Sequence, residues 1–159
     1  MRERAAPRTP ATVLAFDFGL RRIGLASGDT LTQGAAPLPA VRNDDSGPDW
    51  ARIEAQVRAL APGVLVVGAP YNPDGSAGAL SEAARAFAQA LAQRFALPVH
   101  LVDERYSSLE AAQELKARRA SGARRRRLAR GDIDSAAAAV ILARWLAGEG
   151  TAREERGTP

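Results

Sequence analysis

The chain has 159 residues, of which 22 are basic and 18 acidic, so its formal net charge is +4. It contains no cysteine and one histidine, which excludes a disulfide scaffold, a thiolate zinc site and a metal site built on several imidazoles. No apolar run approaches the roughly 20 residues that span a bilayer, and the first residues lack the apolar core of a secretory signal. We therefore expect a soluble cytoplasmic protein with no membrane contact.

The two ends of the chain differ in composition from the part between them. Residues 1–11 combine arginine, proline and alanine without apolar periodicity, and residues 148–159 are rich in glycine and charge. Segments of this kind contribute little to a packed core, so we expect flexible tails at both ends. The remaining residues, 12–147, are long enough for one domain with a substantial core.

Apolar patterns along residues 12–147 predict strands and helices in a definite order. Short apolar runs predict strands at residues 12–17, 22–27, 37–41, 64–68 and 98–102. Helical spacing predicts helices at about residues 49–61, 78–95 and 133–147, with a further helix that begins near residue 108. An opening hairpin followed by strand–helix–strand units implies an α/β fold, with a mixed central β-sheet flanked by helices on both faces.

Three carboxylates lie where α/β proteins place ligand groups, at strand ends and in adjacent loops. Asp17 ends the first predicted strand, Glu104 lies just past the last one, and Asp134 lies in the first turn of the final helix. The helical period puts Asp134 on one face with four apolar residues, which are Ala138, Ile141, Leu142 and Trp145. If that face packs on the sheet, Asp134 is drawn toward the sheet as well.

Carboxylates that are brought together repel one another unless a cation lies among them. Mg²⁺ and Mn²⁺ prefer oxygen ligands, and two such ions about 4 Å apart can activate water and stabilise the leaving oxygen in phosphodiester hydrolysis. Each carboxylate also has a simpler interpretation, because Asp17 suits a turn, Glu104 a solvated surface, and Asp134 or the neighbouring Asp132 a helix cap. The residues alone leave the metal site and these structural roles open.

The positive charge of the chain is concentrated in one segment. Residues 105–147 carry ten basic and four acidic side chains, a net charge of +6, whereas the rest of the chain is nearly balanced. Much of this charge falls in residues 118–130, an expected loop that includes Arg124, Arg125, Arg126 and Arg127. Such a run is typical of a solvated loop, but between two candidate metal ligands it suits phosphate contact equally well.

Four segments together resemble the YqgF/RuvX family of RNase H-like nucleases. They read DFGLRRIGLA, VVGAPYNPDGS, VDERYSS and IDSAAAAVIL and lie at residues 17–26, 66–76, 102–108 and 133–142. They occur in the family's order and extend over nearly all of residues 12–147. The resemblance implies an RNase H-like fold and an endonuclease that depends on Mg²⁺ or Mn²⁺, with Asp17, Glu104 and Asp134 as its catalytic, metal-binding carboxylates.

The same resemblance implies nucleic acid as the partner. Arg22 and Arg105 fall on the family's basic positions and, with the run of residues 124–127, are the candidate nucleic-acid-binding residues. The family has been linked to 5′ maturation of pre-16S ribosomal RNA and to Holliday-junction resolution in DNA recombination and repair. The residues do not distinguish these substrates, although a symmetric four-way junction would favour a homodimer with two active sites.

Two other functions fit parts of the pattern. The segment from Asp17 to Arg22 also resembles the first phosphate loop of actin-like sugar kinases and ATPases, although their second lobe and adenosine site need a far longer chain. A non-catalytic protein would instead hold nucleic acid through the arginine-rich loop, with the steep salt dependence of phosphate contacts. Metal-dependent strand scission would separate the nuclease from both alternatives.

Overall fold

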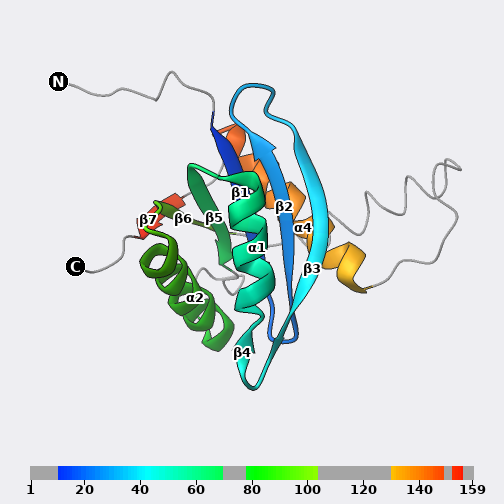
Figure 1. Cartoon of the computed structure of the whole chain (residues 1–159), viewed down its shortest axis with the longest axis vertical. Coiled ribbons are helices and arrows are strands. Elements are labelled where there is room, and N and C mark those ends of the chain that lie inside the picture. Colours follow the sequence, from blue (N-terminus) through cyan, green and yellow to red (C-terminus); the bar gives the residue numbers. More distant parts are fainter. Residues whose placement is uncertain (1–10, 70–77, 104–129, 149–151, 156–159) are drawn as a thin grey trace, which may run out of the picture.

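A computed structural model describes residues 11–69, 78–103, 130–148 and 152–155 of the chain. Figure 1 shows one β-sheet between two layers of helices, with α1 (Trp50–Leu60) and α2 (Ala79–Phe95) on one face and α4 (Arg130–Leu146) on the other. This arrangement confirms the predicted α/β fold with helices on both faces of the sheet. In the described part of the chain, no helix is long and apolar enough to cross a membrane.

The sheet has seven strands among the described residues, in the order β4-β3-β2-β1-β5-β6-β7. Their bounds are β1 Thr12–Phe18, β2 Arg22–Asp29, β3 Ala35–Asp44, β4 Gly47–Pro48, β5 Val64–Ala69, β6 Val99–Asp103 and β7 Ala152–Glu155. Strands β1 to β4 pair antiparallel, β5 and β6 run parallel to β1, and β7 runs antiparallel to β6. The sheet is therefore mixed, and β1, β5 and β6 all end at the same edge.

The central strand β1 contributes to two cores because successive side chains of a strand point to opposite faces. Leu14 and Phe16 are fully buried on the face covered by α1 and α2, where the ring of Phe16 meets that of Phe87 at 5.4 Å. Val13 and Ala15 are fully buried on the other face, against α4. By the same alternation, Asp17 belongs to the α4 face.

Helices α1 and α2 lie close to their predicted bounds, whereas α4 begins at Arg130, three residues before the predicted start at about residue 133. The side chain of Asp49 accepts a hydrogen bond from the backbone N–H of Arg52 at 3.2 Å, so Asp49 is the N-cap of α1. Ala61 and Ala96 end α1 and α2 in the left-handed region, with φ of 47° and 53°. Each helix is followed within a few residues by the next strand, β5 after α1 and β6 after α2.

Three strands differ from the prediction. The predicted strand 37–41 is part of the longer strand β3, Ala35–Asp44, which pairs with β2. Half of the residues of β3 are exposed and it contains two prolines, so its sequence lacks the apolar pattern that would have predicted its full length. The short strand β4 has no apolar pattern at all. The last strand, β7, has three charged residues among its four and lies inside the expected tail of residues 148–159, where it pairs with β6. The helix predicted near residue 108 and residues 118–129 of the predicted loop lie outside the described residues, and residue 130, the last of that loop, is the first residue of α4.

Candidate active site

Asp17 is a nearly buried carboxylate at the end of the central strand. It is 8% exposed and is the penultimate residue of β1. Its neighbours across the sheet are both glycines, Gly24 of β2 and Gly68 of β5. Neither neighbouring strand therefore places a side chain beside Asp17 in this row of the sheet, and the alternation of β1 puts the Asp17 carboxylate on the α4 face.

Helix α4 packs across β1, β2 and β3 on that same face. Its residues Ala138, Ile141 and Leu142 are fully buried, which confirms the apolar face predicted from their spacing. Asp134 lies in α4 one helical turn before Ala138, so its backbone occupies the sheet-facing side of the helix. The side chain of Asp134 falls outside the described part of the structure.

A buried hydroxyl ties the first turns of α4 to the strands next to Asp17. Ser135 is 3% exposed, and its Oγ donates a hydrogen bond to the backbone oxygen of Leu38 at 2.6 Å. The same Oγ accepts a hydrogen bond from the backbone N–H of Leu25 at 3.4 Å. Leu25 directly follows Gly24, the residue paired with Asp17. The start of α4 around Ser135 therefore lies close to the end of β1 that carries Asp17. We call this region, where the start of α4 meets the end of β1, the corner of the sheet.

The other predicted site residues are only partly covered by the structure. Arg22 is the first residue of β2, is half-buried, and lies opposite Arg42 of β3. Glu104 and Arg105 directly follow β6, whose Val102 lies beside Gly68, and they fall outside the described residues. The arginine run 124–127 is also outside them. The relation of Glu104 and these arginines to Asp17 therefore stays a prediction.

Asn43 is a candidate site residue that the sequence analysis misses. Asn43 is 7% exposed, and its Nδ2 donates a hydrogen bond to the backbone oxygen of Gly19 at 2.6 Å. Its backbone N–H donates to the oxygen of Arg21 at 2.9 Å. Asn43 therefore holds the turn that leaves Asp17 and leads to Arg22. The one signal that points to it is a polar residue soon after the apolar end of a predicted strand.

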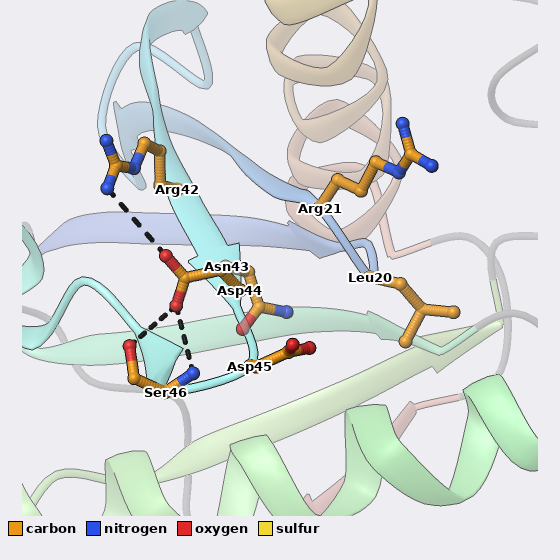
Figure 2. A pocket seen from close by; sticks show the side chains of 7 residues that line it. All are labelled: Leu20, Arg21, Arg42, Asn43, Asp44, Asp45 and Ser46. Carbon is orange, nitrogen blue, oxygen red and sulfur yellow. Dashed lines mark hydrogen bonds and ion pairs between the residues drawn. The ribbon is translucent and has the colours of Figure 1, made fainter.

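An open groove of about 680 Å³ lies beside this turn and is lined by Leu20, Arg21, Arg42, Asn43, Asp44, Asp45 and Ser46. Figure 2 shows Arg42 and Arg21 on opposite sides of the groove, with Arg42 directed toward Asp44. Nη2 of Arg42 lies 3.7 Å from Oδ2 of Asp44. The hydroxyl and N–H of Ser46 hydrogen-bond to Asp44 and, together with Arg42, lower the pKa of its carboxyl. Asp44 thus balances Arg42, whereas Arg21 makes no ion pair with the described residues.

The carboxylate of Asp17 is the kind of ligand that suits a hard divalent cation. Asp17 offers carboxylate oxygens, the ligand type that Mg²⁺ and Mn²⁺ prefer, and its neighbours across the sheet are both glycines. Among the described residues, no three aspartate, glutamate or histidine side chains come together. A complete ligand set for such an ion therefore needs carboxylates outside the described side chains, and Asp134 and Glu104 are the candidates.

The comparisons with known proteins agree on one family and one fold. A family model described as "RuvX: Holliday junction resolvase" matches residues 11–148. A protein of Xanthomonas campestris named "Putative pre-16S rRNA nuclease" is 46% identical over 92% of this chain and 94% of its own length. One with the same name from Edwardsiella ictaluri is 45% identical over 86% of this chain and 95% of its own length.

A solved structure supplies the comparison of folds. RuvC of T. thermophilus in complex with a Holliday junction substrate covers 91% of this chain and 99% of its own, with a TM-score of 0.55 and 19% sequence identity. This likeness confirms the RNase H-like fold that the sequence motifs imply.

Proposed function

This chain belongs to the RuvX family, and we propose that it is an endonuclease that hydrolyses phosphodiester bonds of structured nucleic acid with the help of a divalent cation. The observation that carries the proposal is Asp17, a carboxylate that is 8% exposed at the end of the central strand and flanked by two glycines. Strand ends of this kind are where α/β proteins gather ligand groups. Carboxylate oxygens at such a point suit Mg²⁺ or Mn²⁺.

The proposed ligands of the cation are Asp17, Glu104 and Asp134. Position 134 is on the sheet-facing side of α4, in the corner that also holds Asp17. On β6, Val102 shares the row of Asp17 and Gly68, so a strand that continued its alternation would return to the same face at position 104. These carboxylates would hold the ion. When bound, a divalent cation lowers the pKa of water and stabilises the leaving oxygen of a phosphodiester.

The proposed nucleic-acid contacts are Arg22, Arg105 and the arginine run, which comprises Arg124, Arg125, Arg126 and Arg127. Arg22 begins β2, one residue before the Ile23 that pairs with Phe18 at the end of β1, so it starts at the edge where β1 ends. The net charge of +6 on residues 105–147 favours the approach of a polyanion to the chain. Phosphate contacts position the backbone and carry no sequence information, so they suit DNA and RNA equally.

The substrate is tested by offering both candidates to the same enzyme. Purified full-length chain would be incubated with a four-way DNA junction or with precursor ribosomal RNA that retains its 5′ leader, each with Mn²⁺, Mg²⁺ or a chelator. We expect scission of at least one substrate that requires the metal and stops on chelation. Binding of both substrates without any metal-dependent scission would replace the nuclease with the non-catalytic binding protein.

The assembly on the substrate follows from symmetry. A four-way junction presents two equivalent strands, so its resolution would require two copies of this chain. Light scattering of the protein with and without the junction measures this, and two chains on one junction is the expected stoichiometry. A single chain on the junction would favour the ribosomal RNA precursor.

A further inference from the structure

The ladder between β2 and β3 is irregular beside Asp17. Ile23 pairs with Val41, but the next pair along the ladder is Leu25 with Leu38. Gly24, which lies between them in β2, is therefore opposite two residues of β3. A register shift of this kind disrupts the regular exchange of backbone hydrogen bonds and bends the strand locally. Any polar group that bridges the two strands here would fix the shape of the bend.

Ser135 supplies that bridge. Its Oγ accepts the backbone N–H of Leu25 at 3.4 Å and donates to the backbone oxygen of Leu38 at 2.6 Å. A hydroxyl carries one donor and two acceptor sites, so a single serine serves both strands at the first pair after the irregularity. The two partners lie 110 and 97 residues away in sequence, and Ser135 is 3% exposed. This contact is a buried polar link between α4 and the two strands.

The link is aligned with the proposed metal site at both ends. On the helix, Ser135 directly follows Asp134, and on the sheet, Leu25 directly follows Gly24. Gly24 in turn pairs with Asp17. The Ser135 hydroxyl therefore links the residue after Asp134, one proposed metal ligand, to Leu25. Leu25 in turn follows Gly24, which pairs with Asp17, another proposed ligand.

The apolar contacts of α4 restrain its position along the sheet less sharply than a hydrogen bond does. Its fully buried contacts to the sheet include Ala138, Ile141 and Leu142, which pack against small and branched apolar residues, and near its end the ring of Trp145 lies 5.4 Å from that of His100 on β6. Apolar burial is non-directional, so a small shift of the helix along its axis changes it little. The strength of a hydrogen bond, by contrast, falls when the distance between donor and acceptor grows by a few tenths of an ångström or when the bond angle narrows.

We propose that Ser135 is a positioning residue for the metal site: it fixes the axial position of α4 on the β2–β3 bend, so that the carboxylate of Asp134 meets that of Asp17 around the cation. The inference deepens the proposed nuclease function and rests on it. Residues that orient metal ligands without touching the metal commonly change metal affinity on the order of tenfold or more when they are mutated.

The test compares Ser135→Ala with Ile141→Val. Ile141 is fully buried in the same helix–sheet core, and the change removes one methylene group without touching a hydrogen bond. Binding of Mn²⁺ to full-length protein without nucleic acid would be measured by calorimetry, at a temperature where every variant is folded. Hydrogen exchange of the Leu25 amide would be measured on the same proteins.

We expect Ser135→Ala to weaken Mn²⁺ binding on the order of tenfold and to speed exchange of the Leu25 amide. Ile141→Val should keep Mn²⁺ affinity within about twofold, because it leaves the link intact. Faster Leu25 exchange with wild-type Mn²⁺ affinity in Ser135→Ala would overturn the positioning role and leave the proposed function standing, provided that Asp17→Asn loses Mn²⁺. Wild-type protein that binds no Mn²⁺ would overturn both.

Discussion

Removal of the Asn43 side chain should loosen the turn that follows Asp17. Asn43→Ala deletes the amide that donates to the backbone oxygen of Gly19 at 2.6 Å, but it keeps the 2.9 Å bond from its own N–H to Arg21. An acceptor that loses its buried partner costs about 1–3 kcal/mol. Gly19 is half-buried, so water replaces part of the lost bond and the lower end of this range applies. For a chain of this size, about 1 kcal/mol lowers Tm by about 2–4 °C.

Thermal unfolding followed by circular dichroism measures this effect. Ser46→Ala is a matched control, because the Ser46 hydroxyl bonds only the exposed Asp44 in the neighbouring turn, and its loss should change stability by less than about 0.5 kcal/mol. Asn43→Ala should also weaken nucleic-acid binding, since the turn it holds leads into Arg22. The reasoning is refuted if Asn43→Ala has the Tm of the wild type, or if Ser46→Ala loses as much.

Three further outcomes are expected. Gly28→Ala should destabilise the fold strongly, because a Cβ there would collide with the backbone oxygen of Gly34, whereas Gly63→Ala meets only an ordinary contact and serves as the control; thermal unfolding compares them. The backbone N–H of Thr32 lowers the pKa of Asp29 below its ordinary value of 3.8. The ionised carboxylate therefore stabilises the fold above pH 3.8, and this stabilisation is lost as the pH falls through the lowered pKa. The difference in stability between wild type and Asp29→Asn should accordingly disappear in acid. Replacing the arginine run 124–127 with alanine should make nucleic-acid binding less dependent on salt. In a filter-binding titration, the slope of log K against log salt concentration should become shallower by up to about 0.9 for each phosphate contact that is lost.

The parts of the fold that were predictable are those with a periodic apolar signal. The runs at 12–17 and 64–68 correspond to β1 and β5 because strands buried on both faces are apolar at every position. The sheet-facing side of α4 follows from the spacing of Ala138, Ile141 and Leu142. The position of Asp17 at a strand end follows in turn from the end of its apolar run.

The parts that were not predictable depend on contacts between distant segments. Strand β7 forms because β6 offers it an edge, and its own charged sequence shows no strand pattern. Ser135 and Asn43 act through hydrogen bonds to backbone atoms 97–110 and 24 residues away, and such bonds leave no periodicity in the sequence. The assembly of Glu104 and Asp134 with Asp17 stays a prediction, supported by the resemblance and by the position of α4.

The measurement that tests the central claim most directly separates binding from cleavage in Asp17→Asn. The variant keeps the size of the side chain and removes its charge, and Glu82→Gln makes the same change at an exposed site on α2, across the sheet from α4. Wild type, Asp17→Asn and Glu82→Gln would be mixed with the cleaved substrate and Mn²⁺, and bound and cut fractions would be scored in the same samples. We predict that Asp17→Asn binds as the wild type does but does not cut, while Glu82→Gln does both. Cleavage by Asp17→Asn at the wild-type rate would contradict the assignment of Asp17 to the metal site.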